Sequence, residues 1–297
     1  MSLESVRRLL PSLAQLRTQI VVLSGGEPLL NPEWASIAQT LLSNGRQLWL
    51  LTSGLSLAKH ARRAAGLFSH ITVSLDGADA PTYAAIRGLD AFDKVCEGIR
   101  AAARHGVPAG IRVTLQRANF RQLPAFVDLA KNLGARSLSF LAVDVANPHA
   151  FGRSDDFASD LALRPQDLAE FEQVLSAVEI DCREDFRSGF ILETPQRLRR
   201  LLQYFEAIQG HADYPSVRCN APEFSAVIGA SGRVQPCFFI PGPADARVAS
   251  AAGRIGDELA MVLNGEALAS LRSAIRSGAR RECKTCVCSL WRDPAAP

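Results

Sequence analysis

The feature that most constrains this chain is an alternation of short apolar runs and longer helical stretches in its first half. Apolar runs bounded by Gly, Asn or Pro predict five strands, at Gln19–Leu23, Gln47–Leu51, His70–Leu75, Gly110–Leu115 and Ser137–Leu141. Between them, Asn31 and Pro32 are typical of a helix start and Gly134 of a helix end. The alternation predicts an α/β fold with a parallel sheet, in which ligands bind beyond the C-terminal strand ends.

The sequence divides into three predicted segments, 1–145, 146–210 and 211–297. The first carries the alternation but opens with a predicted helix, Leu3–Leu16, that no strand precedes. The second begins with polar residues 146–165, which form either a solvated linker or part of a substrate pocket. Further elements are predicted beyond residue 145, with helices at Pro165–Ile180, Pro195–Ile208 and Glu266–Ser277 and a hairpin of Phe224–Ile228 and Val234–Cys237.

Composition excludes several classes of protein. With 47% hydrophobic and 21% charged residues, the chain has the composition of a folded protein. No apolar run approaches the roughly 18 residues of a membrane-spanning helix, and the arginine-containing first residues do not resemble a signal peptide. A net charge of +3 is too small to indicate nucleic acid. We therefore expect a cytoplasmic protein with neither a membrane nor a nucleic acid as partner.

Residues Gly25, Gly26, Glu27 and Pro28 directly follow the first predicted strand. The two glycines allow a ligand to approach the backbone closely, and the carboxylate at the strand-end cleft can bind an ammonium group. The segment is neither a phosphate-binding Walker loop nor a dinucleotide fingerprint. A plain turn is the alternative interpretation.

Three more polar positions lie near predicted strand ends. Ser74 and Asp76 share one face of the third strand by alternation, and they either hydrogen-bond a polar ligand or cap a helix. Ser53 follows the second strand. Arg87 either pairs with a carboxylate through two hydrogen bonds or is an ordinary surface arginine.

The chain has seven cysteines, of which five come after residue 210, namely Cys219, Cys237, Cys283, Cys286 and Cys288. The other two, Cys96 and Cys182, fit buried thiols. Without a secretory signal, three cysteines within six residues indicate metal ligation rather than disulfides. Thiolates from a hairpin and a terminal loop can converge on one centre, either an iron–sulfur cluster or structural Zn²⁺.

Together these motifs resemble the radical S-adenosylmethionine (SAM) superfamily, in particular members with a C-terminal SPASM or twitch domain. The resemblance implies a partial (β/α) barrel followed by a small cysteine-rich α+β domain that carries an auxiliary iron–sulfur cluster. It implies that Glu27 binds the amino group of SAM, that Arg87 meets its carboxylate, and that Ala142 lies near the adenine. The cofactor-binding residues implied in this way are Gly25, Gly26, Glu27, Pro28, Ser53, Ser74, Asp76, Arg87 and Ala142.

The cysteines resemble the smaller, twitch pattern. Cys219, Cys237, Cys283 and Cys286 match that pattern, and Gly232 matches its glycine. Cys288 is an additional thiol that is the alternative to Cys286 as a ligand. The resemblance therefore implies one auxiliary [4Fe-4S] cluster, with zinc as the alternative.

One departure from the family is large. Its Cys-x-x-x-Cys-x-x-Cys loop, whose thiolates hold the radical cluster, is absent, and no cysteine precedes Cys96. The gap coincides with the missing strand before Leu3–Leu16. One hypothesis is a chain that lacks its N-terminal segment, in which case the longer chain carries a second [4Fe-4S] cluster. The other is a degenerate member without that cluster. DNA with no in-frame upstream Cys-x-x-x-Cys-x-x-Cys would contradict the first.

The resemblance implies an enzyme that cleaves SAM reductively, so that a 5′-deoxyadenosyl radical abstracts hydrogen from a peptide or small-metabolite substrate. An electron donor such as flavodoxin or ferredoxin is then the expected partner. The alternative is a non-catalytic iron–sulfur or zinc module that binds a peptide. Formation of 5′-deoxyadenosine distinguishes the two. No residue is assigned a catalytic role.

Overall fold

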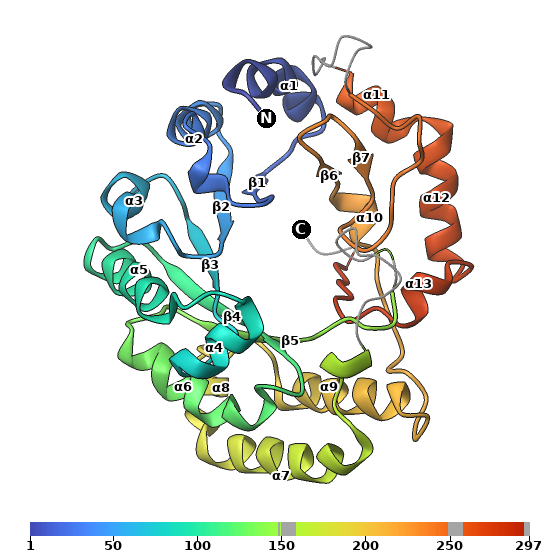
Figure 1. Cartoon of the computed structure of the whole chain (residues 1–297). Coiled ribbons are helices and arrows are strands. Elements are labelled where there is room, and N and C mark those ends of the chain that lie inside the picture. Colours follow the sequence, from blue (N-terminus) through green and yellow to red (C-terminus); the bar gives the residue numbers. More distant parts are fainter. Residues whose placement is uncertain (148, 150–158, 249–257, 294–297) are drawn as a thin grey trace. The chain divides into compact units, whose positions relative to one another are not determined.

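A computed structural model describes residues 1–147, 149, 159–248 and 258–293 of the chain (Figure 1). The chain forms two compact units, each assembled from separated stretches. We call Ile20–Val143 with Ala158–Asp213 the sheet unit, and Met1–Gln19 with Asp144–Phe157 and Tyr214–Pro297 the cysteine unit. Among the described helices, none is long and apolar enough to cross a membrane.

The sheet unit contains five parallel strands that lie in chain order. Their bounds differ from the predicted ones by one residue at most at either end, with β1 at Ile20–Leu23, β2 at Gln47–Thr52, β3 at His70–Ser74, β4 at Ala109–Leu115 and β5 at Leu138–Ala142. The α/β class and the partial (β/α) barrel predicted from the sequence are confirmed. Short apolar runs predicted these strands well because a parallel sheet covered by helices buries its central strands.

Four helices cover one face of this sheet (Figure 1), namely α2 (Trp34–Ser43), α3 (Leu57–Ala64), α5 (Phe92–Arg104) and α6 (Leu123–Asn132). Alternation decides which strand residues face them. Leu50 and Ile71 are fully buried, whereas Trp49 and Arg112 are exposed. The predicted helix start is wrong by two residues. Asn31 was expected as the cap, whereas Glu33 directly precedes α2 and donates its amide to Asn31 Oδ1 at 2.9 Å in the preceding turn.

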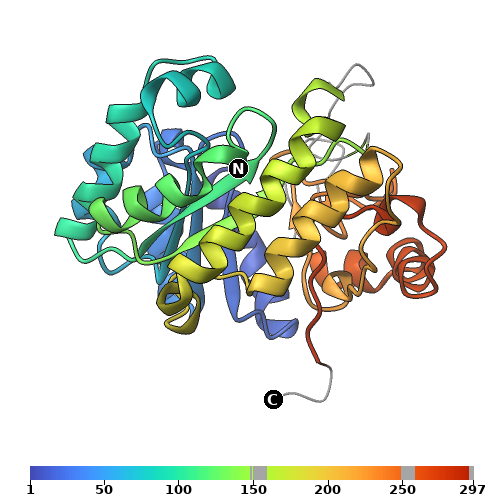
Figure 2. The same ribbon diagram turned by 90° about the horizontal axis from the view of Figure 1, so that it is seen from below.

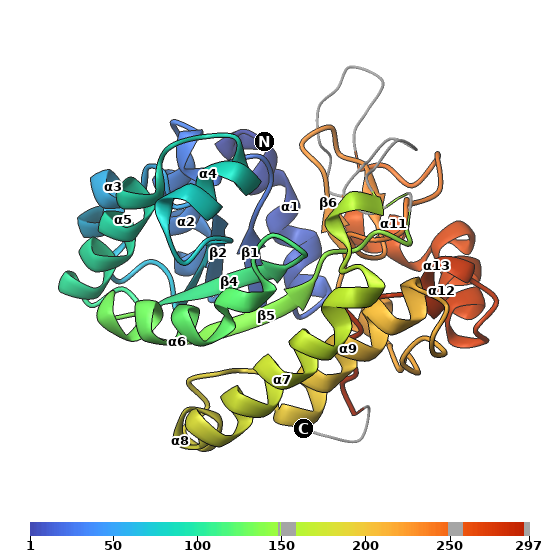
Figure 3. The ribbon, with the colours of Figure 1, turned by 60° about the horizontal axis from the view of Figure 1, so that its bottom comes forward.

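Two long helices, α7 (Pro165–Asp181) and α9 (Pro195–Ile208), lie side by side in two views of the sheet unit (Figures 2 and 3). Phe171 of α7 packs edge-on against Phe205 of α9 and also against Phe120, with ring centroids 6.2 and 5.6 Å apart. Between these helices, α8 (Arg183–Arg187) leads to a segment that pairs with the free edge of β5. There, Leu138 donates its amide to the carbonyl of Phe190 at 2.7 Å.

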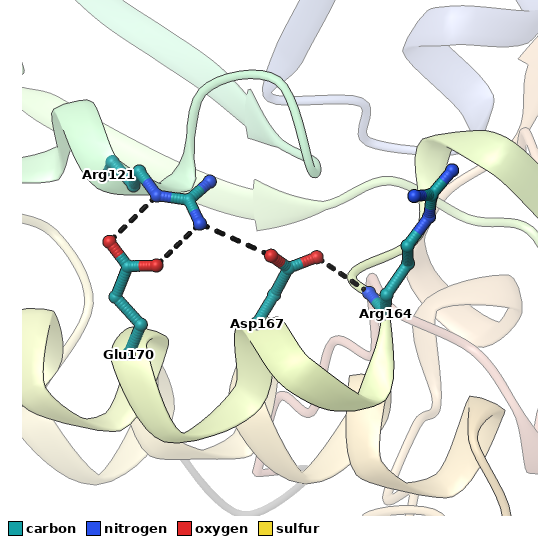
Figure 4. Close-up of polar contacts among 4 residues, drawn as sticks. All are labelled: Arg121, Arg164, Asp167 and Glu170. Carbon is teal, nitrogen blue, oxygen red and sulfur yellow. Dashed lines mark hydrogen bonds and ion pairs between the residues drawn. The ribbon is translucent and has the colours of Figure 1, made fainter.

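A polar network holds the first turn of α7 against the 3-10 helix η2 (Phe120–Gln122) (Figure 4). Arg121 donates from Nε and Nη2 to the two carboxylate oxygens of Glu170, at 2.7 and 2.5 Å, and from Nη2 to Asp167 at 3.2 Å. The other oxygen of Asp167 accepts the Arg164 amide at 3.0 Å, which completes a cap on α7. The network therefore joins the end of β4 to α7.

The cysteine unit combines helices with one short hairpin, namely α1 (Leu3–Gln15), α10 (Ala221–Phe224), α11 (Leu259–Asn264), α12 (Glu266–Arg276), α13 (Arg281–Lys284), β6 (Val227–Ile228) and β7 (Val234–Gln235). The hairpin is confirmed, but its strands are shorter than predicted because Phe224 ends α10. Helix α1 packs against α11, and Ser12 Oγ accepts the Ala260 amide at 3.5 Å. Thus α1 belongs to this unit, although the sequence grouped it with 1–145.

Candidate cofactor site and cysteine centre

The carboxylate of Glu27 joins the loop after β1 to the end of β2. It accepts hydrogen bonds from Thr52 Oγ1 at 2.8 Å, from the Ser53 amide at 2.9 Å and from Ser53 Oγ at 2.6 Å. The Leu29 amide, in the 3-10 helix η1 (Pro28–Leu30), also donates to it at 3.2 Å. Because a carboxylate has about four acceptor positions, an ammonium group bound here would replace one of these present donors.

Gly25 and Gly26 leave the backbone beside this carboxylate uncovered. Gly25 has a φ of +121°, a conformation that glycine adopts readily and other residues rarely do. A Cβ added to either residue would meet no atom within 4 Å. The main chain before Glu27 is therefore open to close approach by a ligand.

Asp76 and Arg87 form a second pair of predicted site residues. Asp76 lies two residues beyond β3 and is only 4% exposed. Its Oδ2 is 2.5 Å from Nη2 of Arg87, the last residue of α4 (Ala80–Arg87), and its Oδ1 accepts the Thr114 amide at 2.7 Å. Burial raises the pKa of Asp76, while Arg87 and the Thr114 amide oppose that rise. A guanidinium has five N–H donors, so Arg87 retains donors for an external carboxylate.

Asn119 and Gln122, to which no sequence motif pointed, hold this pair in place. The fully buried Asn119 donates from Nδ2 to the carbonyls of Asp76 and Thr114, at 2.8 and 3.0 Å, and accepts the Gln116 amide at 2.8 Å. Gln122 binds the N-terminal cap of α4 through both its amide nitrogen and its oxygen. The available signal was an asparagine shortly after a strand, since asparagine often bonds to nearby backbone.

The remaining predicted cofactor residues end strands of the same sheet. Ser74 is the last residue of β3, and Ala142 is the nearly fully buried last residue of β5. Parallel strands end at one edge of the sheet, so Ser74 and Ala142 lie along the edge that also carries Glu27 and Asp76. The structure thus pairs Glu27 with Ser53 and Asp76 with Arg87, at one edge.

Three cysteines of the cysteine unit have pKa values that are raised by burial and, to a smaller extent, by neighbouring cysteines, namely Cys237, Cys283 and Cys286. Burial, with smaller effects from Cys237 and Cys219, raises the pKa of Cys283 to about 11. The pKa of Cys286 is raised by burial and by Cys288, Cys219 and Cys237. Cys219 and Cys237 thus act on the ionisation of both Cys283 and Cys286. In the described part of the chain, no three His, Cys, Asp or Glu side chains are grouped closely enough to hold a metal ion as they stand.

The surroundings of Cys286 and Cys288 differ. Cys286 Sγ accepts the Cys288 amide at 3.4 Å, just as Cys237 Sγ accepts the Phe239 amide at 3.4 Å. Cys286 is partly buried, whereas Cys288 is exposed. Hydrogen bonds to sulfur tune an iron–sulfur centre. Cys96 and Cys182 are buried free thiols, as predicted.

The donor set fits an iron–sulfur cluster. Thiolates are soft ligands that suit such clusters and zinc. Buried thiols with raised pKa values stay protonated unless a cation compensates the thiolate charge, and a bound metal does so. Cys237 and Cys286 each accept a hydrogen bond from a backbone amide at the sulfur, which suits a sulfur that carries negative charge.

A cavity of about 600 Å³ opens in the cysteine unit, next to Cys283 in sequence. Its polar lining comes from two arginines, a histidine, a threonine and a glutamate, namely Arg280, Arg281, His149, Thr285 and Glu282. His149 belongs to the polar segment 146–165, whose Asp155 and Asp156 lie outside the described residues. Asp160 is described and pairs with Arg117 at 3.6 Å.

The fold and the cysteine arrangement define an α/β protein with an appended cysteine-rich domain, and family models agree with both parts. Residues 1–130 match the model of the radical SAM superfamily, and residues 219–287 match that of the SPASM iron–sulfur cluster-binding domain. Residues 1–130 therefore carry a radical SAM domain, and residues 219–287 carry a SPASM domain.

Curated relatives match part of the chain. A protein described as a probable GTP 3',8-cyclase, from Saccharolobus islandicus, is 32% identical over 180 residues, which are 58% of this chain and 55% of that protein. An AdoMet-dependent heme synthase from Methanosarcina barkeri is 32% identical over 136 residues, 44% of this chain and 39% of that protein. This chain thus spans about half or less of the length of these relatives.

Solved structures share the fold at low sequence identity. The structure of anSMEcpe with bound AdoMet and Cp18Cys peptide has a TM-score of 0.59 at 20% identity, and covers 90% of this chain and 73% of its own. The structure of Streptococcus suis SuiB bound to S-adenosylmethionine has a TM-score of 0.62 at 14% identity. It covers 97% of this chain and 65% of its own. These similarities establish the fold alone.

Proposed function

We propose that this chain binds SAM at the strand ends of the sheet unit and one auxiliary [4Fe-4S] cluster in the cysteine unit. We further propose that it acts in radical SAM chemistry on a peptide or small-metabolite substrate. The observation that carries the proposal is the match of residues 219–287 to the SPASM model, because this range contains Cys219, Cys237, Cys283 and Cys286.

In the sheet unit, each contact to SAM has a chemical reason. Glu27 supplies the carboxylate for the amino group, and the uncovered Gly25 and Gly26 allow close approach beside it. Arg87 supplies its remaining donors for the methionyl carboxylate, while its bond to Asp76 fixes the guanidinium. Ser74 supplies a hydroxyl at the same edge for the ribose. The 297 residues contain no Cys-x-x-x-Cys-x-x-Cys to hold the radical cluster that would supply the electron for cleaving SAM.

In the cysteine unit, Cys219, Cys237, Cys283 and Cys286 are the proposed ligands. Cys286 is preferred to Cys288 because it is partly buried and lies within the electrostatic influence of Cys219 and Cys237. Cys288 instead donates its amide to the Cys286 sulfur. In this role the exposed Cys288 thiol is dispensable.

The substrate class has two alternatives. The curated relatives carry the names of a GTP cyclase and a heme synthase, whereas the structures of similar fold include SuiB bound to its precursor peptide SuiA. We propose the cavity beside Cys283 as part of the substrate site, because its arginines suit the carboxylates of a peptide and the phosphates of a nucleotide equally. Flavodoxin or ferredoxin is the proposed electron donor.

Metal analysis tests the cluster. After anaerobic reconstitution of residues 1–297, we expect about four iron and four sulfide per chain, as for one four-cysteine cluster. Cys286→Ser is expected to lose most of this iron, and the matched control Cys288→Ser to keep it. Zinc without sulfide would overturn the cluster, and iron lost only from the Cys288→Ser variant would reverse the ligand choice.

A glycine substitution tests the SAM site. Gly26→Ala places a methyl group where no protein atom lies within 4 Å, so the fold should tolerate it while the ligand should not. We expect SAM affinity, measured by equilibrium dialysis, to fall about tenfold, which is about 1.4 kcal/mol, with an unchanged urea midpoint. Gly229→Ala, in the cysteine unit, is the matched control. Equal SAM affinity in all three proteins would contradict the site.

A second candidate is a binding module without radical chemistry. It is favoured by one observation, that the 297 residues contain no Cys-x-x-x-Cys-x-x-Cys. Formation of 5′-deoxyadenosine distinguishes the two functions. The protein is expressed from its own gene, loaded with iron and sulfide, and mixed with dithionite and SAM. Product supports the radical enzyme, and a loaded, SAM-binding protein that forms none supports the module.

A further inference from the structure

Asn220, the residue after Cys219, is hydrogen-bonded to the backbone of Leu290 and Arg292, and we call this set of hydrogen bonds the clamp. Asn220 donates its amide to the carbonyl of Leu290 at 3.0 Å and its Nδ2 to the carbonyl of Arg292 at 2.7 Å, and its Oδ1 accepts the Arg292 amide at 2.9 Å. Asn220 is only 8% exposed. A single side chain thus pairs with the backbone of a segment that is 72 residues away in the sequence.

The residue before Cys219 contacts the same segment. The guanidinium carbon of Arg218 lies 3.7 Å from the ring centroid of Trp291. A guanidinium over an indole face at this distance is attractive even at a partly exposed site. Both neighbours of Cys219 therefore hold residues 290–292.

This clamp matters because the preceding residues carry the other thiols. Cys283 lies in α13, which has four residues, and a helix this short is unstable on its own. Cys286 follows it, four residues before the clamped Leu290. The position of both thiols relative to Cys219 therefore depends on what fixes the segment at either end.

The length of chain between the thiols shows the scale of the effect. Without the clamp, 67 peptide bonds join Cys219 to Cys286. With the clamp, the shortest path from one thiol to the other runs through Asn220 and Leu290 and contains only about five residues. Loop closure in a flexible chain scales as the −3/2 power of length. Because α10, the hairpin, α11 and α12 fold within this stretch, roughly tenfold is the upper scale of the gain in local concentration of the Cys286 thiol at Cys219.

We propose that Asn220, supported by Arg218, is the positioning residue that holds Cys283 and Cys286 at the cluster. This inference rests on the proposed auxiliary cluster. Asn220 touches no iron in this role and acts through the backbone of Leu290 and Arg292. The device is a retention clamp, since it lowers the rate at which the segment leaves a loaded cluster.

Iron release tests the clamp. Reconstituted proteins are mixed with an excess of an iron chelator, and the loss of cluster absorbance is followed. We expect Asn220→Ala to lose iron about tenfold faster than the unmodified chain. Asn264→Ala is the matched control. Asn264 also lies in the cysteine unit, on α11, and its Nδ2 donates to the carbonyl of Ala260 at 2.9 Å. It should lose iron at the unmodified rate.

Arg218 provides a second, milder variant in case Asn220→Ala does not fold. Arg218→Gln removes the cation above Trp291 and should speed iron release a few-fold, while Arg218→Lys keeps a cation and should restore most of the retention. The unfolding midpoint of the iron-free protein should fall only slightly in Arg218→Gln, because an exposed cation–π contact is weak. A fall in this midpoint as large as that of Asn220→Ala would indicate a general structural role instead.

The outcomes separate the clamp from the function on which it rests. If the unmodified chain takes up no iron and sulfide, the proposed cluster fails. If the unmodified chain is loaded, and the folded Asn220→Ala or Arg218→Gln variants release iron no faster, the clamp fails and the cluster stands. Faster release from Asn264→Ala as well would also overturn the clamp.

Discussion

At the scale of single residues, Asn119 holds the backbone of Asp76, the partner of Arg87, through a hydrogen bond to the Asp76 carbonyl. It satisfies two carbonyls and one amide with a single fully buried side chain. Unpaired buried polar groups cost about 1–3 kcal/mol each, and the costs do not simply add. A small substitution here therefore affects both stability and the proposed SAM site.

We expect Asn119→Ala to lower the free energy of unfolding by about 3 kcal/mol, because it leaves the Asp76 carbonyl and the Gln116 amide without their partner. Urea denaturation measures the loss. Asn44→Ala is the matched control, since Asn44 Nδ2 donates to the Thr40 carbonyl at 2.8 Å on an exposed helix end. A loss for Asn119→Ala no larger than that of the control would show that this network carries little energy.

His70 makes stability depend on pH. Burial and the neighbouring Arg112 lower the pKa of His70 from its ordinary value of 6.5. The folded protein therefore binds fewer protons than the unfolded chain, so stability is complete above pH 6.5 and is lost as the pH falls through the lowered pKa. Urea midpoints between pH 7.5 and 5 should fall less steeply for His70→Gln than for the unmodified chain or the exposed control His105→Gln. Parallel curves would refute this assignment.

At the scale of elements, α7 is attached to η2 by ion pairs of Arg121 with two carboxylates that differ in how deeply they are buried. Glu170 and Arg121 are about half exposed, whereas the Asp167 side chain is 11% exposed and also caps the helix (Figure 4). Exposed ion pairs contribute about 0–1 kcal/mol, while loss of a helix cap costs about 1 kcal/mol and loss of a buried partner adds to it. The two carboxylates of the same network should therefore differ in their effects.

We expect Asp167→Ala to lower the free energy of unfolding by about 2 kcal/mol and Glu170→Ala by less than about 1 kcal/mol. Salt at 1 M should remove most of the Glu170 effect, because a Debye length of about 3 Å screens exposed charges. It should leave most of the Asp167 effect. Denaturation of both variants at low and high salt measures the contrast, and equal losses for the two would contradict it.

The elements that could be predicted from sequence are those that local patterns specify. Residues such as Leu50 and Ile71 form apolar runs in a buried sheet, so every strand of the sheet unit was placed to within one residue. The hairpin was predicted to start too early in the chain. An apolar residue such as Phe224 fits a strand or a short helix equally well, and in the structure Phe224 ends α10. The grouping of α1 depends on its contact with α11, which no local pattern records.

The residues of the candidate sites could be predicted where a local pattern marks them, but their partners could not. Glu27, Asp76 and Arg87 stand out because they are polar residues near strand ends. That Asp76 binds Arg87 rather than standing free, and that Asn119 binds the Asp76 carbonyl, depends on partners 11 and 43 residues away. Asn220 and Arg292 are further apart still. Such pairs appear only once the fold has brought them together.

At the scale of the whole molecule, the two proposed ligands belong to different units. A ligand that binds only the folded form stabilises the residues that hold it. We expect reconstituted iron to slow hydrogen exchange in residues 219–240 and 281–292, and SAM to slow it in residues 25–29, 52–54 and 76–87. Mass spectrometry of each loaded form measures both effects. Protection of the sheet unit by iron alone would contradict separate sites.

The separated stretches of the cysteine unit also determine when it can form. Helix α1 has an apolar stripe of Val6, Leu9 and Leu13, yet its partner Ala260 is 248 residues later than Ser12. At about 5–20 residues per second, a ribosome needs roughly 12–50 seconds to cover that distance. For this interval the stripe has no α11 to cover it. We therefore expect α1 to need protection during synthesis more than a helix whose neighbours in space are also its neighbours in sequence.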